Sequence, residues 1–174
     1  MNRARYALIG AVGMTALVAA PLQAQAQDAV AELIDGKANP VGTAQLNQLE
    51  QGVQIVVAVS GLPAGKHALH IHETGECEPP FESAGGHFNP TDAEHGWDNP
   101  QGPHAGDLPN IYVGEGAVQV EYITDLVTLE DGETSLFDDD GAAIVIHQGQ
   151  DDYLTEPAGD AGMRLACGVI EQSG

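Results

Sequence analysis

Short runs of alternating or β-branched apolar residues, separated by turn-forming dipeptides, recur along most of this 174-residue chain. Alternation with a period of two is typical of half-buried strands, and Gly, Asp and Pro between such runs favour turns. No stretch beyond residue 26 has the longer period of an amphipathic helix. We therefore predict an all-β domain, an antiparallel sandwich or barrel. Its expected strands cover residues 29–34, 41–49, 53–59, 68–72, 111–113, 117–123, 126–129, 142–147 and 165–170.

The first 26 residues have the features of a cleaved secretory signal peptide rather than of a folded domain. Arg3 and Arg5 precede an apolar stretch at residues 7–20, which is too short to span a bilayer well. Small residues then follow at Ala24 and Ala26, the pattern that signal peptidase reads. Cleavage is expected after Ala26, with Ala24 as the alternative. We predict that residues 27–174 form one exported domain.

The charge of the chain restricts its partners. It has 26 Asp and Glu against 5 Lys and Arg, a formal net charge of −21. Loss of the signal would leave only Lys37, Lys66 and Arg164 as cations. Such a charge repels phosphate backbones and anionic lipids, so we expect neither a nucleic-acid nor a membrane partner. A hydrophobic content of 43% nevertheless favours a packed core over disorder.

Two long segments lack any strand pattern, residues 73–110 and residues 148–163. The first is rich in Gly and Pro, and a loop of that length in a compact domain needs something to hold it. It contains Cys77, and the other cysteine of the chain is Cys167. An even number of cysteines in an exported protein favours one disulfide over two separate buried thiols.

The histidines are the strongest indication of chemistry, because six of the seven lie between His70 and His147. His70 and His72 alternate with apolar residues, so both imidazoles should leave the same face of one strand. The first long loop adds three further histidines and a carboxylate, and a histidine ends a late strand. Imidazole suits copper and zinc, and one tetrahedral ion cannot use six histidines. The spacing indicates either two metal ions or one ion and several bystanders.

Five motifs, met in order along the chain, resemble those of the copper/zinc superoxide dismutases. They are His70-Ile71-His72-Glu73, Gly85-Gly86-His87-Phe88-Asn89-Pro90, His95-Gly96, His104-Ala105-Gly106-Asp107-Leu108 and Arg164-Leu165-Ala166-Cys167-Gly168-Val169-Ile170. The leading segment and Cys77-Glu78-Pro79-Pro80 resemble the bacterial periplasmic branch. The resemblance implies a periplasmic protein with an eight-stranded antiparallel Greek-key β-barrel, a flattened sandwich with two long functional loops.

The resemblance also implies one copper and one zinc ion per subunit. The copper ligands it implies are His70, His72, His87 and His147. The zinc ligands it implies are His87, His95, His104 and Asp107, so that His87 bridges the two ions.

Further residues match positions around those ligands. Asp151 matches a carboxylate that links a copper histidine to a zinc histidine, and His67 matches a packing histidine that is not a ligand. Arg164 matches the cation beside the open copper face.

The implied activity is the conversion of superoxide to oxygen and hydrogen peroxide, with Arg164 and His87 as catalytic residues. Arg164 would hold the anion, and His87 would supply a proton. Superoxide is then the small-molecule partner, and the resemblance leaves monomer and homodimer open. The alternative is a non-catalytic periplasmic protein that binds copper and zinc. A zinc hydrolase is disfavoured, because four protein ligands leave no open zinc position for water.

Overall fold

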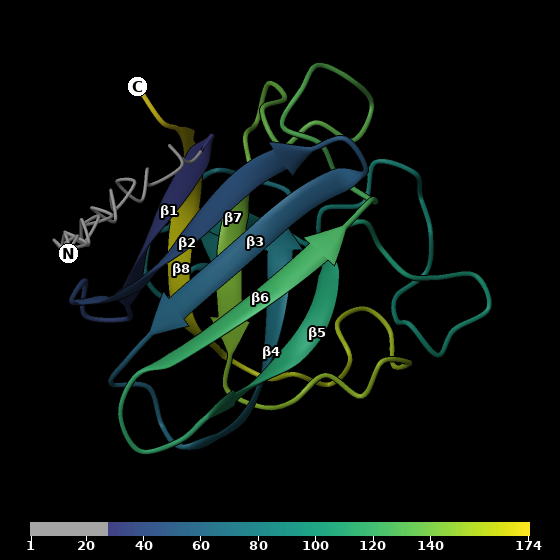
Figure 1. Ribbon diagram of the computed structural model, residues 1–174. Coiled ribbons are helices and arrows are strands. Elements are labelled where there is room, and N and C mark those ends of the chain that lie inside the picture. Colours follow the sequence, from purple (N-terminus) through teal and green to yellow (C-terminus); the bar gives the residue numbers. More distant parts are fainter. Residues whose placement is uncertain (1–27) are drawn as a thin grey trace, which may run out of the picture.

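The computed structural model describes residues 28–174, so the signal peptide predicted for residues 1–26 lies outside the described residues. Eight antiparallel strands form the domain (Figure 1). They are β1 (Ala29–Asp35), β2 (Pro40–Leu49), β3 (Gly52–Val59), β4 (Gly65–His72), β5 (Asp107–Val113), β6 (Val118–Thr124), β7 (Ala143–His147) and β8 (Arg164–Gln172). Within residues 28–174 the single helical element is a short 3₁₀ turn, Glu82–Ala84, and no described helix could cross a membrane.

The strands form one sheet that curls into a nearly closed barrel. Their hydrogen-bonded order is β5-β4-β7-β8-β1-β2-β3-β6. β5 and β6, at the two ends of this order, come into contact without forming a ladder. After β3 the chain crosses the barrel to β4, which lies on the opposite side between β5 and β7. This crossing is the Greek-key connection (Figure 1). The predicted fold, an eight-stranded antiparallel barrel with two long loops, is confirmed.

Alternating burial explains why these residues form strands. In β3 the side chains of Val53, Ile55, Val57 and Val59 are buried, and the residues between them are half-buried. Burying an aliphatic side chain of this size contributes about 1.5–3 kcal/mol relative to leaving it exposed. The inward face of the strand thus drives its pairing in one register, because a slip of one residue would expose that face.

Strand β7 is buried on both faces, and this feature places the functional loops. Ile144 and Ile146 belong to the main core. Ala143 and Val145 alternate with them and pack in a second cluster with Phe81. The loop between β4 and β5 therefore covers the outside of the barrel over β7 and β8. From here on this segment is called the 73–106 loop.

Two predictions about strand extent were wrong. Residues 126–129 form no strand, since Val127 and the later Leu136 are buried in a loop and join the core from outside the sheet. Gln48 accepts hydrogen bonds from the backbone of Leu129 and the hydroxyl of Thr128, which takes the place of a ladder. β4 and β5 also begin earlier than predicted. Gly65 pairs with Val113 and starts β4, and Asp107 pairs with His70 and starts β5.

Candidate metal centre

Four histidines converge on the outside of the barrel. His70 and His72 lie two residues apart on β4, and His147 ends the neighbouring strand β7. His87 comes from the 73–106 loop, where it forms an isolated bridge with His72. All four are buried, and each offers a ring nitrogen within 4.8 Å of the others. We call His70, His72, His87 and His147 the first group.

The hydrogen bonds of two of these rings determine their tautomers. His72 Nδ1 lies 3.0 Å from the carbonyl oxygen of Gly85, and His147 Nδ1 lies 3.2 Å from that of Gly162. A carbonyl oxygen can only accept, so both Nδ1 atoms carry hydrogen and both Nε2 atoms carry lone pairs. These two Nε2 atoms face each other at 3.4 Å. Two lone pairs this close with no proton between them form a site that suits a cation.

The other two rings direct free nitrogens to the same place. His70 donates through Nε2 to Asp151 at 2.8 Å, which leaves a lone pair on its Nδ1. Among the described residues, His70 Nδ1 and His87 Nε2 are buried ring nitrogens without any hydrogen-bond partner. An orphaned buried polar atom is costly unless a ligand pairs with it. Four imidazole nitrogens are a donor set that fits copper.

A second group surrounds a buried carboxylate. Asp107 Oδ1 lies 2.8 Å from His87 Nδ1, and His95 Nδ1 and His104 Nδ1 lie 3.1 and 3.4 Å from the carboxylate. The backbone amides of Gly96 and His104 donate to Oδ2, which orients the carboxylate. Three ring nitrogens and one carboxylate oxygen fit a tetrahedral zinc ion. We call His87, His95, His104 and Asp107 the second group.

His87 belongs to both groups and Asp151 connects them. The Nδ1 atom of His87 lies in the second group, and its Nε2 atom points to the first. Asp151, which is 1% exposed, accepts from His70 through Oδ2 and from His95 through Oδ1 at 3.0 Å. One histidine and one carboxylate thus join the two groups directly.

Burial keeps the first group neutral. It lowers the pKa of His87 to about 4 and that of His147 to about 3. Burial also places the pKa of His72 well below 6.5 and lowers that of His70, although the hydrogen bond to Asp151 opposes the latter shift. These imidazoles are therefore neutral at pH 7, which is the form of histidine that binds metal ions.

In the second group, the pKa of His95 shifts in the opposite direction. Burial alone would lower the pKa of His95, but hydrogen bonds to Asp107 and Asp151 outweigh it and raise the pKa to about 10. The pKa values of Asp107 and Asp151 are held far below the usual range, because hydrogen bonds outweigh burial in both carboxyl groups. Asp107 accepts from His104, His87 and His95, and Asp151 accepts from His70 and His95. A divalent ion at His95 Nδ1 would displace the proton there and take its place beside Asp107.

Arg164, the first residue of β8, stands beside the first group. It pairs with His147 across the ladder, and its guanidinium donates to the carbonyl oxygens of Phe81 and Gly85. The Gly85 oxygen also accepts from His72. The predicted disulfide between Cys77 and Cys167 is present and ties the 73–106 loop to β8 three residues after Arg164. The cation and the first group are therefore held by the same loop.

The chain is similar to known proteins over most of its length. Residues 40–170 match the family described as copper/zinc superoxide dismutase. The chain belongs to this family. A relative named superoxide dismutase [Cu-Zn] 2, from Aquifex aeolicus, is 53% identical over 144 residues, which cover 80% of this chain and 84% of that protein. The superoxide dismutase [Cu-Zn] of Caulobacter vibrioides is 41% identical, over 82% of this chain and 84% of the relative.

Solved structures agree with the fold of this superoxide dismutase. A superoxide dismutase-like protein from Bacillus subtilis has a TM-score of 0.77 at 40% identity, covering 80% of this chain and 96% of that one. The copper/zinc superoxide dismutase of Brucella abortus has a TM-score of 0.66 at 26% identity, covering 82% and 98%. This chain is an oxidoreductase that converts superoxide to oxygen and hydrogen peroxide, with copper and zinc as its cofactors.

The structure places all the sequence-predicted site residues of the superoxide dismutase in one region. His67 stands outside both groups, since its two nitrogens lie 2.8 Å from the carbonyl oxygens of His147 and Pro63. Sequence reasoning missed the carbonyls of Gly85 and Gly162, for which no sequence signal exists. It also missed Asn110, whose only signal was its place three residues after Asp107.

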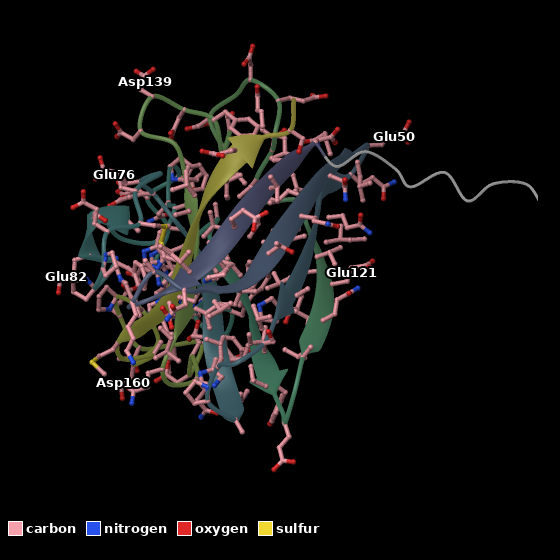
Figure 2. The ribbon with its side chains drawn as sticks, turned by 90° about the vertical axis from the view of Figure 1, so that its left-hand side faces the viewer. Glu50, Glu76, Glu82, Glu121, Asp139 and Asp160 are labelled. Atoms are coloured by element: carbon pink, nitrogen blue, oxygen red, sulfur yellow. A yellow bond between two sulfur atoms is a disulfide. The ribbon has the colours of Figure 1, made fainter. Side chains whose placement is uncertain are left out.

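Carboxylates are spread over the surface of the molecule (Figure 2). Figure 2 shows labelled carboxylates projecting from widely separated parts of the molecule, among them Glu76, Glu121 and Asp160. Burial lowers the pKa of Arg164, and the nearby carboxylates of Glu82 and Glu73 oppose this shift. Arg164 nevertheless stays charged at pH 7, as arginine does in proteins. A superoxide anion approaching the enzyme therefore meets a positive group at the site and negative groups around it.

Proposed function

We propose that the first group holds copper, that the second group holds zinc, and that His87 bridges the two ions through its two ring nitrogens. The observation that carries this assignment is the pair of Nε2 lone pairs of His72 and His147, which face each other without a proton. The orphaned Nδ1 of His70 and Nε2 of His87 complete the copper set. The carboxylate of Asp107 distinguishes the second group and favours zinc there.

Copper supplies the reversible one-electron chemistry of the reaction when bound, which zinc cannot. Arg164 binds the superoxide anion by charge-assisted hydrogen bonds, because the two carbonyl contacts use only part of its five N–H donors. While Nε2 of His87 is not bound to copper, it would hold a proton and give it to superoxide as that anion is reduced, and water would give the second proton. Asp151 keeps His70 and His95 in the required orientations.

A superoxide-consumption assay tests this proposal on protein loaded with copper and zinc, before and after chelation. Arg164→Ala should keep both metals and lower kcat/KM by about 10-fold or more, since a hydrogen bond to a charged group contributes about 1.5–3 kcal/mol. Lys37→Ala removes an exposed cation that belongs to neither group and serves as the control. Full activity of Arg164→Ala would contradict the role of Arg164. Loaded protein that consumed no superoxide would instead be a metal-binding protein without catalysis.

The proposal extends to location and domain bounds. Residues 1–26 are a cleaved signal peptide, residues 27–174 are the mature enzyme, and the enzyme works in the periplasm. The basic and apolar pattern of the leading segment supports this, and the disulfide suits an oxidising compartment. Fractionation of expressing cells and a mass measurement of the mature chain test it. Protein found in the cytoplasm with its first 26 residues attached would contradict it.

The enzyme is further proposed to form a homodimer. The described residues expose several large apolar side chains, and aromatic residues and Met are enriched in subunit interfaces. The exposed side chains include Trp97, Tyr112, Ile123, Leu154 and Met163. Sedimentation over a range of concentrations tests this. A single-subunit mass at every concentration would contradict it.

A further inference from the structure

Asp151 lies in a segment that has no ladder of its own. From here on residues 148–163, between β7 and β8, are called the 148–163 loop. Its buried carboxylate must reach His70 and His95 at the same time, at 2.8 and 3.0 Å. Hydrogen bonds of this length tolerate only small displacements before they weaken. The position of the Asp151 backbone therefore decides whether both contacts form.

Asn110 on β5 holds that backbone from the barrel side. Its side-chain oxygen accepts from the Asp151 backbone N–H at 2.7 Å, and its Nδ2 atom donates to the Asp151 carbonyl at 2.9 Å. An amide can make this pair of contacts because it offers one acceptor and donors on the same plane. The side chain thus replaces the missing neighbouring strand for one residue of the 148–163 loop.

Tyr153 forms hydrogen bonds with both Asn110 and Asp151. Its hydroxyl accepts from the backbone N–H of Asn110 at 2.8 Å, and its own N–H donates to Asp151 Oδ1 at 2.7 Å. Tyr153 has a φ of 65°, a left-handed conformation that is unusual for an aromatic residue. Gly159 closes the other side, where a Cβ atom would collide with the Asp151 carboxylate and the His95 ring. Asp151 is held from both sides.

We propose that Asn110 is a positioning residue that holds Asp151 against His70 and His95 and so couples zinc retention to the geometry of the copper ligands. The same strand carries Asp107 and Asn110 three residues apart, so β5 presents a zinc ligand and the clamp on one rigid element. Displacement of Asp151 would weaken its hydrogen bonds to His70 in the first group and to His95 in the second group at the same time. This inference rests on the proposed assignment of the second group to zinc.

Zinc release tests the proposal in full-length enzyme loaded with both metals. Loss of a residue that orients a ligand costs about 10–100-fold in metal affinity, so Asn110→Ala should release zinc to a competing chelator at least about 10-fold faster. Asn110→Asp keeps the size of the side chain but places an acceptor against the Asp151 carbonyl, and it should act in the same direction. Asn47→Ala is the matched control, because Asn47 makes an amide contact with Gln54 far along the barrel.

A double-mutant cycle with Asp151→Ala separates positioning from general damage to the fold. If Asn110 acts through Asp151, adding Asn110→Ala to Asp151→Ala should change zinc release little further. The Cu(II) electron paramagnetic resonance spectrum should also shift in Asn110→Asp and stay unchanged in Asn47→Ala. Equal effects of Asn110→Ala in both backgrounds, or an unchanged zinc release, would overturn the proposal. Full zinc content in His104→Ala would contradict the zinc assignment itself, and with it this inference.

Discussion

Replacing both cysteines of the disulfide by serine removes the covalent link between the 73–106 loop and β8. The bond joins residues separated by 90 positions, with Cα atoms 5.6 Å apart. In the chain-entropy description, closing a loop of that length contributes about 4–5 kcal/mol to the free energy of unfolding. For a domain of this size each kcal/mol shifts Tm by about 2–4 °C, so Tm should fall by about 8–20 °C.

The loss should also reach the site. Cys167 is buried with Phe81 and Ala84, and the carbonyl oxygens of Phe81 and Gly85 accept from Arg164. We expect the double serine variant to retain copper and zinc, since neither cysteine is a ligand, but to lose activity at equal metal content.

The assay combines thermal unfolding of the protein without metals, which avoids the contribution of metal binding, with activity and metal content of the loaded enzyme. Restoring the link chemically is not possible in the serine variant, so reduction of the parent enzyme gives the matching reversible comparison. A decrease in Tm that is smaller than about 3 °C would refute the stability argument. Full activity despite a large decrease would show that the loop holds Arg164 without the bond.

Three further predictions concern the metals, the salt dependence and the pH dependence. His87→Ala should lose a ligand from both ions, whereas His104→Ala should lose zinc first and keep part of its copper; metal analysis that found both ions in His87→Ala would contradict the bridge. Between about 0.01 and 0.15 M salt, kcat/KM should rise or stay flat, because added salt screens the repulsion between superoxide and the acidic surface; a clear decrease would show that attraction by Arg164 dominates capture. In protein without metals, folding lowers the pKa of His87 from 6.5 to about 4 and that of His147 to about 3. The stability that these two residues contribute is therefore present above pH 6.5 and is lost as the pH falls toward 4. An unfolding midpoint in urea that did not decrease from pH 7 to pH 5 would count against this.

The strands could be predicted where one face alone is buried. β3 alternates throughout, and its range was predicted to within one residue. Alternation predicted a strand wrongly where apolar residues enter the core from a loop, as Val127 does. It also failed at the start of β5, where Asp107 and Asn110 are polar because they serve the site. A polar strand end has no alternation to detect.

The sequence could predict which residues the two groups bring together, because the spacing of the histidines was informative and the order of the motifs supplied the rest. The sequence also predicted Asp151 and Arg164 beside them, but it did not predict the hydrogen bonds that orient these side chains. The tautomer of His147 depends on the Gly162 carbonyl, which any residue could provide at that position. The hydrogen bonds that hold Asp151 depend on Asn110, which lies on β5 and is 41 residues away in the sequence. Such contacts arise only when the chain is folded.

One carbonyl group shows why the loops and the barrel must form together. The oxygen of Gly85 accepts from His72 Nδ1, which leaves the lone pair of that ring on Nε2, and it accepts from Arg164, which places the cation. Gly85 has a φ of 73°, and a side chain there would strike Glu73. The disulfide and Phe81 hold this part of the loop on β7 and β8. A displaced loop would therefore alter a copper ligand and the anion-binding residue at once, so metal binding and substrate binding depend on the same packing.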